Sequence, residues 1–278
     1  MLSYRHAFHA GNFADVLKHL VQVEILAYLH KKDKPFMYID THAGAGMYSL
    51  DSAQAQKTAE HLSGYSALRS LNWPELENYL QTVKELSQQD TELNLYPGSP
   101  AIAQEFLREY DKAILFELHS SDFLLLQEFM RGDRRLRVNK ADGLHGLLAS
   151  VPPVIKRGLV LIDPSYEIKT DYEEVVDTLI QAYKKFSTAT YALWYPVVER
   201  ERVKKIENTL KASGIKNIQQ FELGLLADTD GRGMTAAGMI VINPPYTLKN
   251  TLDSVLPKLC KHLSGGKGIW RSEILVAE

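Results

Sequence analysis

The sequence has little of what marks disulfide-bonded, zinc-binding or membrane-spanning proteins. Its 278 residues include a single cysteine, Cys260, which excludes an intrachain disulfide and a zinc site built from several cysteines. The longest apolar runs, near Leu159–Ile162 and Met239–Ile242, are far shorter than the roughly 18 residues of a transmembrane helix. The start, MLSYRHAFHAGN, has His and Arg where a secretion signal is apolar. We therefore expect a cytoplasmic protein that does not cross a membrane.

Neither charge nor composition is extreme. Lys and Arg number 32 and Asp and Glu 34, for a net charge of −2, so a nucleic-acid partner would have to be held by a local basic patch. Apolar residues make up 45% and charged residues 24% of the chain, the balance of an ordinary globular protein. Because no repeat or low-complexity tract divides it, we expect one domain over residues 1–278.

Helical periodicity is clearest near the amino terminus. Asn12 is a suitable N-cap, and apolar residues follow at helical spacing to about His30. A second helical stretch, from about 52 to 95, lies between the first two expected strands, and we interpret it as an inserted helical subdomain. The turn Tyr96-Pro97-Gly98-Ser99-Pro100 is expected to start another helix, with Ser99 as its N-cap.

Short apolar runs that lead to acidic residues predict a parallel sheet. They are Phe36–Asp40, Ala113–Glu117, Leu136–Asp142 and Gly158–Asp163, followed by Ala189–Trp194. Because the runs alternate with helical patterns, the strands should be parallel and their carboxyl ends should share one edge. Four carboxylates would then meet there. In the tail, Asn217–Leu226 and Gly238–Ile242 predict a hairpin that makes the last strand antiparallel.

The first of these strands runs into a glycine-rich turn, Asp40-Thr41-His42-Ala43-Gly44-Ala45-Gly46. Glycine lets a ligand approach the backbone closely, and a helix after the turn would offer free N–H groups. The dinucleotide-binding pattern G-x-G-x-x-G is disfavoured, because Ser49 stands where that pattern has its last Gly or Ala. In addition, the next acid at a strand end, Glu117, lies 71 residues after Gly46, whereas the pattern has an acid about 20 residues on. The other interpretation is a turn without a ligand.

Glu117 and Asp142 would add the polar groups that an adenosine needs. A carboxylate at the end of the second strand can accept hydrogen bonds from both ribose hydroxyls, and one at the third can accept from an adenine amino group. Each alone could equally be a solvated strand terminus. Together with the glycine turn they predict a site for an adenosyl ligand.

The turn Asp163-Pro164-Ser165-Tyr166 carries the most specific chemistry. Its proline fixes φ and removes an N–H, so the turn can hold a carboxylate and a backbone carbonyl against an exocyclic amine while the tyrosine ring stacks on the base. Two such acceptors favour the pyramidal amine that attacks a methyl sulfonium. The alternative is a β-turn with an exposed tyrosine.

A similar turn, Asn243-Pro244-Pro245-Tyr246, follows the strand that we expect to be antiparallel. The end of that strand would lie at the opposite edge of the sheet from the glycine turn. We therefore interpret the second turn as structural.

Two further groups of residues are less specific. His6, His9, Asp15 and His19 match no zinc spacing, so we expect no metal and a role in capping and pocket lining. Basic runs occur at Arg131–Lys140 and Arg200–Lys205, and either could contact RNA or be a solvated surface.

Taken together, the motifs resemble the bacterial RlmJ family of 23S ribosomal RNA adenine-N6 methyltransferases, which are class I enzymes dependent on S-adenosylmethionine. The most specific segment is the N-terminal block from Tyr4 to His19, YRHAFHAGNFADVLKH. The other matching segments are Asp40–Gly46, Tyr96–Pro100, Leu159–Tyr166, Ala192–Pro196 and Arg232–Met239. The resemblance covers nearly the whole chain. It implies a Rossmann-like α/β fold with a mostly parallel seven-stranded sheet, an antiparallel last strand and the helical insertion.

The resemblance also implies roles for residues. The pocket for S-adenosylmethionine would be lined by His19, His42, Gly44, Gly46, Ser99, Glu117, Asp142, Gly143 and Asp163. The catalytic residues would be Asp163, Pro164 and Tyr166, and Tyr4 and Lys18 would contact the RNA. Ser165 departs from the family, which usually has a second proline there. The change loosens one torsion but keeps the catalytic groups, so we expect activity to survive.

The implied reaction is methyl transfer from S-adenosylmethionine to N6 of adenine 2030 in 23S rRNA, by a monomer that uses no metal. The adenine would have to leave its stack, at a cost of a few kcal/mol. The competing enzymatic interpretation is methylation of DNA adenine or of a protein glutamine. Asp163 and the N-terminal block argue against it. The competing non-enzymatic one is a protein that binds donor and RNA without catalysis, with Ser165 as the lesion.

Overall fold

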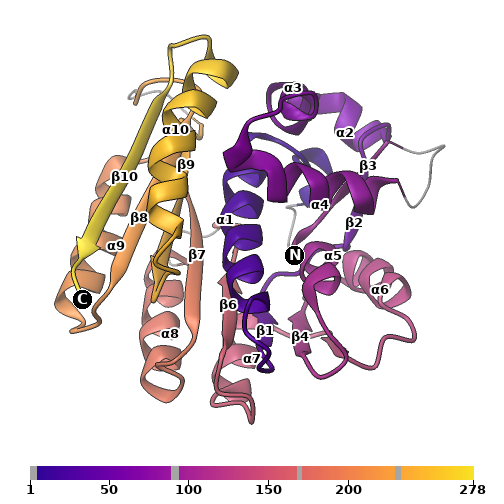
Figure 1. The fold of residues 1–278 in the computed structure, drawn as a ribbon, viewed down its shortest axis with the longest axis vertical. Helices are drawn as coiled ribbons and strands as arrows, with labels where there is room; N and C mark the ends of the chain where they lie inside the picture. Colours follow the sequence, from indigo (N-terminus) through magenta and orange to yellow (C-terminus); the bar gives the residue numbers. More distant parts are fainter. Residues whose placement is uncertain (1–4, 89–93, 168–170, 229–232) are drawn as a thin grey trace.

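The computed structural model describes residues 5–88, 94–167, 171–228 and 233–278. At its centre is an eight-stranded sheet in the order β10-β8-β9-β7-β6-β1-β4-β5 (Figure 1). Its strands are β1 (Met37–Asp40), β4 (Lys112–Phe116), β5 (Leu136–Asn139), β6 (Gly158–Ile162), β7 (Thr190–Val197), β8 (Ile218–Gly224), β9 (Ala236–Ile242) and β10 (Ile269–Val276). A separate two-stranded ladder pairs β2 (Met47–Ser49) with β3 (Leu95–Pro97).

The sheet is parallel in one half and antiparallel in the other. β5, β4, β1, β6 and β7 are parallel neighbours, whereas the pairs β7–β9, β8–β9 and β8–β10 are antiparallel. The predicted α/β class and the antiparallel hairpin of the tail are confirmed. The sheet has eight strands instead of seven, because β10 forms a largely exposed edge whose sequence, IWRSEILV, lacks the apolar run that marks the other strands.

Helices cover both faces of the sheet (Figure 1). Alternate strand residues point to opposite faces, and on β1 Tyr38 joins one core while Met37 and Ile39 join the other. The first core includes residues of α1 (Phe13–His30), α4 (Glu77–Ser87), α5 (Ser99–Phe106), α6 (Ser120–Phe129) and α10 (Leu248–Ser264). The second includes residues of α7 (Gly143–Ser150), α8 (Asp171–Lys185) and α9 (Arg200–Ala212). With both faces covered, a ligand site has to lie at an edge.

Helix α1 forms as predicted. The Asn12 side chain accepts a hydrogen bond from the N–H of Asp15 and caps the helix, which ends at His30. Most of its residues are buried, including the polar side chains Asp15, Lys18, His19 and Gln22. Buried polar groups need internal partners, so the first half of α1 supplies polar contacts to the interior.

The stretch between β1 and β4 is largely helical. Its elements from 52 to 95 are α2 (Ala53–Thr58), η2 (Glu60–Ser63), α3 (Tyr65–Leu68), η3 (Pro74–Leu76) and α4. Leu68, Tyr79 and Val83 belong to the same core as α1, so these helices pack on the helical layer of the sheet. Nowhere in the described ranges does a helix have the length and apolarity to span a membrane.

Candidate active site

The acidic residues predicted at the strand ends meet at one edge of the sheet. Asp40 ends β1, and Glu117, Asp142 and Asp163 follow β4, β5 and β6. A cavity of about 350 Å³, which we call the larger cavity, opens at this edge and has the size of a small-molecule pocket. The predicted site residues that line it are Lys18, His19, His42, Gly44, Ser99, Glu117, Asp142, Gly143, Asp163 and Pro164.

The glycine turn closes on Glu117. Gly44 has a φ of +65°, and its N–H donates to Oε2 of Glu117 over 2.8 Å. A Cβ at position 44 would lie 2.1 Å from the hydroxyl oxygen of Tyr48, so only glycine fits. Gly46 is not among the residues that line the larger cavity, and its carbonyl accepts from the N–H of Gly98. The turn leads into β2, so no helix directly after it offers free N–H groups.

Backbone groups hold Glu117 and Asp142. Oε1 of Glu117 accepts from the N–H two residues later over 2.6 Å, and burial raises the pKa of this carboxyl. Asp142 caps α7 and keeps a side chain that is 45% exposed. At the neighbouring Gly143, a Cβ would lie 1.8 Å from the carbonyl oxygen of Thr41. The start of α7 therefore packs directly against the end of β1.

Ser99 acts differently from the prediction. The N-cap of α5 is Gly98, and Ser99 is the first residue of the helix. Its hydroxyl donates to Oδ2 of Asp40 over 2.7 Å, and the hydroxyl of Tyr38 donates to the same oxygen over 2.7 Å. Burial raises the pKa of Asp40 to about 6 although both bonds favour the ionised form. The contact joins the end of β1 to the start of α5 at the wall of the larger cavity.

His19 has a ring nitrogen without a partner at the larger cavity. Its side chain is fully buried, and Nδ1 lies 2.8 Å from the hydroxyl oxygen of Tyr96. Nε2 has no hydrogen-bond partner among the described residues, and it is 4.0 Å from Oδ1 of Asp15. Burial lowers the pKa of His19 to about 3, so the ring is neutral near pH 7. An unpartnered buried polar atom costs about 1–3 kcal/mol, which favours a ligand atom as its partner.

We expect His19 to make folding stability depend on pH between about 4.5 and 6.5. The pKa of His19 is about 3 in the folded chain, against a usual 6.5, so in this window only the unfolded chain binds the proton. The free energy of unfolding should therefore fall as the pH falls, by up to about 1.4 kcal/mol per pH unit. The His19→Asn variant, which can keep the bond to Tyr96, should lack this contribution. Urea unfolding of both proteins across the window tests this, and parallel pH profiles would contradict it.

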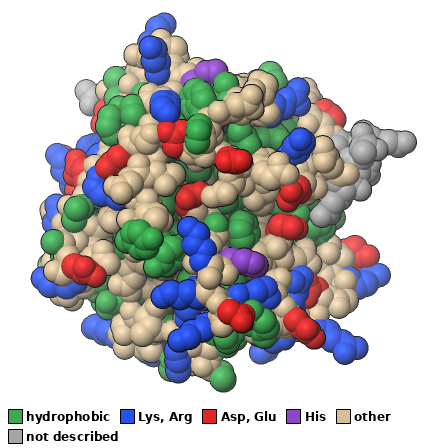
Figure 2. Space-filling model, in the orientation of Figure 1, with side chains coloured by type: hydrophobic (Ala, Val, Ile, Leu, Met, Phe, Trp, Pro, Cys, Tyr) green, Lys and Arg blue, Asp and Glu red, His purple; other side chains and the backbone are tan. Residues whose placement is uncertain are grey.

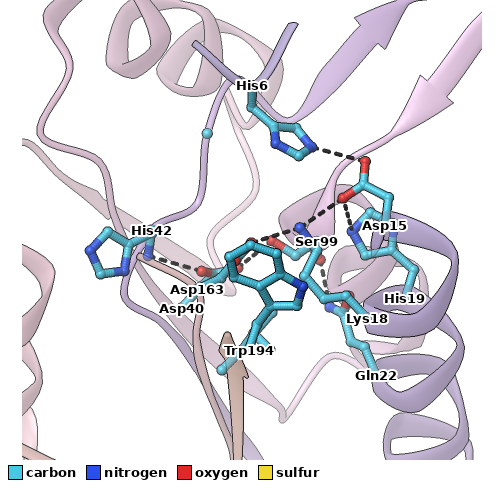
Figure 3. A network of polar contacts seen from close by, with 12 residues as sticks. His6, Asp15, Lys18, His19, Gln22, Asp40, His42, Ser99, Asp163 and Trp194 are labelled. Atoms are coloured by element: carbon cyan, nitrogen blue, oxygen red, sulfur yellow. Dashed lines mark hydrogen bonds and ion pairs between the residues drawn. The ribbon is translucent and has the colours of Figure 1, made fainter. Parts of the chain in front are cut away.

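Lys18 bridges two carboxylates beside the larger cavity (Figure 3). Its Nζ lies 2.8 Å from Oδ1 of Asp15 and 2.6 Å from Oδ2 of Asp163. Oδ2 of Asp15 in turn lies 2.9 Å from Nε2 of His6 and accepts from the N–H of Gly11 over 2.9 Å. Helix α1 thereby positions the carboxylate of Asp163.

The charges of this cluster depend on one another. Burial lowers the pKa of Lys18, but Asp15 and Asp163 together hold it well above its usual value. Burial likewise raises the pKa of Asp15, but His6, Lys18 and His19 hold it well below its usual value. Lys18 is only 5% exposed, so most of its side chain lies inside the cluster. A contact between Lys18 and the target nucleotide stays a prediction.

A second cavity, of about 220 Å³, adjoins the first, and we call it the smaller cavity. His6, Lys18, Asp163 and Ser165 line both. The other walls of the smaller cavity are mainly aromatic or apolar and include Tyr166, Tyr172, Trp194, Pro196, Val198 and Met234. Nε1 of Trp194 is buried without a hydrogen-bond partner in the described part of the chain. The ion-pair cluster thus lies between two cavities of different character.

Tyr166 lines the smaller cavity and not the larger one. Its φ is +52°, its hydroxyl donates to the carbonyl of Trp194 over 2.7 Å, and its ring centroid lies 4.4 Å from that of Tyr172. These contacts exclude the alternative of an exposed tyrosine on a simple turn. They hold the ring as part of an aromatic wall next to Asp163.

The chain matches known ribosomal RNA methyltransferases. The family model described as Ribosomal RNA large subunit methyltransferase D, RlmJ, matches residues 33–276. The chain belongs to the RlmJ family. Ribosomal RNA large subunit methyltransferase J of Escherichia coli strain K12 is 54% identical over 93% of each chain. The Haemophilus influenzae protein of the same name is 47% identical over 100% of each chain.

A solved structure supports the fold of this chain. Protein LPL1258 from Legionella pneumophila superposes with a TM-score of 0.87 at 37% identity, over 96% of this chain and 98% of that one. The family places the chain among rRNA methyltransferases of the large subunit. The larger cavity has matching chemistry for an adenosyl-type donor, since it combines the carboxylates of Glu117 and Asp142 with the unpartnered nitrogen of His19.

The Asn243 turn lies at the edge of the sheet opposite the glycine turn, as predicted. β9 is antiparallel to β7, and Ile242 pairs with Tyr191, so Asn243 lies at the edge where β7 begins. Its side-chain amide donates to the carbonyls of Ser187 and Ala189 over 2.8 Å each, at a φ of +52°. These bonds anchor the turn at the edge of the sheet opposite Asp163.

The histidines near the amino terminus contact carboxylates. His6 lies beside Asp15, and Nδ1 of His9 is 3.0 Å from each carboxylate oxygen of Glu60. Within the described residues, no group of three or more His, Cys, Asp or Glu side chains is placed to hold a metal ion.

The two basic runs differ in how many of their charges are paired. Ion pairs neutralise Arg200, Arg202, Lys204 and Lys205 on α9 and Arg131 and Arg135 near β5. Arg134, Arg137 and Lys140 are exposed and form no ion pair with any described residue. The run at β5 is therefore the one with charge left for a partner.

Sequence patterns did not reveal every functional residue. Tyr4, predicted to contact RNA, is outside the described residues. The central position of Asp15 was missed, although its place three residues before Lys18 on one helix was a usable signal. Trp194 was not predicted as a site residue although it lies in the matching segment Ala192–Pro196, because only the fold places its indole in the cavity that Asp163 also lines.

Proposed function

We propose that this chain transfers the methyl group of S-adenosylmethionine to N6 of adenine 2030 in 23S rRNA. The observation that carries the proposal is the position of Asp163, which lines both cavities. A donor in the larger cavity and an adenine in the smaller one would meet at this residue. Transfer between two bound molecules needs such a junction, because the reacting atoms must be held about 3–3.5 Å apart.

The larger cavity offers partners for each polar part of the donor. Both oxygens of Glu117 already accept one backbone N–H, and their second lone pairs can accept the ribose hydroxyls. Asp142, with its exposed carboxylate, can accept from the adenine amino group. Nε2 of His19 is left for the amino-acid end of the donor. When bound, the donor supplies an electrophilic methyl group on a sulfonium.

The smaller cavity suits a base that has left its stack. Enzymes that act on a base bind it between aromatic or apolar side chains and read its polar edge. Tyr166 and Trp194 supply such walls. The unpartnered Nε1–H of Trp194 can donate to a ring nitrogen of adenine, which has acceptors at those positions.

Asp163 is assigned to orienting the target amine. Its Oδ2 accepts from Lys18, and Oδ1 has no partner among the described residues. Hydrogen bonds from the N6 amine to Oδ1 and to the carbonyl of Pro164 would favour the pyramidal amine, whose lone pair can attack. Lys18 fixes the carboxylate in place and balances its charge.

Two other functions fit the same fold less well. The Asn243 turn is of the type found in DNA-adenine and glutamine methyltransferases, but it lies at the edge of the sheet opposite the two cavities. At the edge that holds the cavities the corresponding residue is an aspartate, Asp163. A silent binding protein would need a damaged catalytic turn, yet Ser165 leaves Asp163 in its 2.6 Å contact with Lys18. We further propose that the chain acts as a cytoplasmic monomer, in the compartment where bacterial rRNA is made.

The decisive experiment is methyl transfer from labelled S-adenosylmethionine to an unmodified 23S rRNA transcript, followed by nuclease digestion and mass spectrometry. N6-methyladenosine as the product would establish the base and the atom. A transcript with guanine at position 2030 is the matched control and should remain unmethylated. If calorimetry detects donor binding but no RNA becomes methylated, the proposed substrate is wrong.

A further inference from the structure

The edge that holds the two cavities offers little positive charge to an RNA. Lys18, Arg5 and Arg200 each form ion pairs with carboxylates. The larger cavity is also lined by Asp122, Glu167, Asp171 and Glu174. Phosphates supply much of the affinity of proteins for nucleic acids. In the described part of the chain, this affinity has to come from another surface.

Such a surface lies at the opposite edge, where the parallel strands begin. It comprises residues 31–34, 108–112, 134 and 156–157, and we call it the strand-start surface. Its cations are Lys31, Lys32, Lys34, Arg108, Lys112, Arg134, Lys156 and Arg157, and its acids are Asp33, Glu109 and Asp111. Figure 2 shows Lys and Arg side chains gathered on the lower half of the visible face. This excess stands out in a chain whose net charge is −2.

Hydrogen bonds fix these segments against one another. Arg108 donates to the carbonyls of Lys32 and Lys34 over 2.9 Å each, and Arg157 donates to that of Lys34 over 3.0 Å. Nζ of Lys112 lies 3.5 Å from the carbonyl oxygen of Arg134. The cations therefore project from one rigid surface and not from independent loops.

Local structure accounts for only some of these cations. Lys31 and Lys32 follow the end of α1, where positive charge suits the helix dipole. Arg108 and Arg157 bind carbonyls, and Arg108 also forms an ion pair with Asp111. Lys112 makes only the 3.5 Å contact with the carbonyl oxygen of Arg134, and Arg134 and Lys156 serve neither purpose. All three are exposed, and no ion pair joins them to any described residue. Crowded like charges are unfavourable unless an anion binds them.

We infer that the strand-start surface binds the phosphate backbone of the substrate RNA. The inference rests on the proposed function, because it names where that same RNA is held. β1 has four residues, so the two edges are roughly 15 Å apart. Along this side of the sheet lie the exposed Arg137, on the edge strand β5, and the exposed Lys140, directly after the end of β5. An RNA whose adenine enters the smaller cavity can follow β5 to the strand-start surface.

The test compares two triple variants with the wild type. Lys32→Gln/Lys112→Gln/Arg134→Gln removes three charges from the strand-start surface. Arg131→Gln/Lys204→Gln/Lys205→Gln removes three charges that are already paired, and it is the matched control. Binding of a 23S rRNA domain transcript is measured against salt concentration. KM for the RNA, kcat and the affinity for the donor are measured for the same three proteins.

The first variant should bind RNA about tenfold more weakly, and its slope of log affinity against log salt should be shallower by about 2, since each phosphate contact contributes about 0.7–0.9. KM should rise while kcat at saturating RNA and donor affinity stay unchanged. The control variant should match the wild type. Normal methylation with an unchanged salt slope in the first variant would overturn the inference and leave the proposed function intact. Binding to anionic lipid vesicles is measured for the same variants. If the first variant lost vesicle binding but kept RNA binding, the surface would bind a membrane and the inference would be overturned.

Discussion

Replacing Asp163 by asparagine is expected to lower the rate of 23S rRNA methylation by about 10³-fold, while the affinity for S-adenosylmethionine changes by less than about fivefold. The asparagine keeps the size of the side chain but removes the charge that Lys18 and the target amine share. Donor binding depends mainly on other residues of the larger cavity, such as Glu117 and His19. Single-turnover methylation and calorimetry of the same preparation separate the two effects.

The matched control is Asn243→Gly, in the similar turn at the other edge. Glycine tolerates the φ of +52° but loses the two hydrogen bonds to Ser187 and Ala189. The variant should therefore unfold at a lower temperature and methylate at nearly the wild-type rate. If Asn243→Gly were inactive and Asp163→Asn active, the assignment of the two turns would be reversed.

The sheet edge and its acids could be predicted from the sequence because both depend on local patterns. An apolar run in a parallel sheet ends where the strand ends, so the runs alone place Asp40, Glu117 and Asp163 at one edge. The antiparallel hairpin of β8 and β9 was equally visible as two runs around a polar loop. These features need no knowledge of distant residues.

The contacts that define the chemistry could not be predicted, because they join distant parts of the chain. Ser99 has the sequence context of an N-cap, and only the proximity of Asp40, 59 residues earlier, gives its hydroxyl another acceptor. Lys18 follows the pattern of an ordinary helical lysine, and its partner Asp163 lies 145 residues later. β10 was missed because edge strands are exposed and need no apolar run.

Removing the charge of Lys18 should destabilise the fold strongly. In Lys18→Met, Asp15 and Asp163 lose the cation between them, and Asp15 is 1% exposed. An uncompensated buried charge costs about 3–5 kcal/mol, so the free energy of unfolding should fall by about that amount at pH 7. Urea unfolding measures the loss directly. A decrease of less than about 1 kcal/mol, the size of a surface ion pair, would show that the cluster is not a buried charge network.

The double variant Asp15→Asn/Lys18→Met separates the structural role of this cluster from its catalytic one. It removes both buried charges, and the amide of Asn can still accept from the N–H of Gly11. Most of the lost stability should therefore return, a non-additive result expected of contacting residues. Methylation should stay at least about tenfold below wild type, because Asp163 still lacks the cation that positions it. If activity returned together with stability, Lys18 would be needed only for folding, and the orientation of Asp163 would have to come from the turn itself.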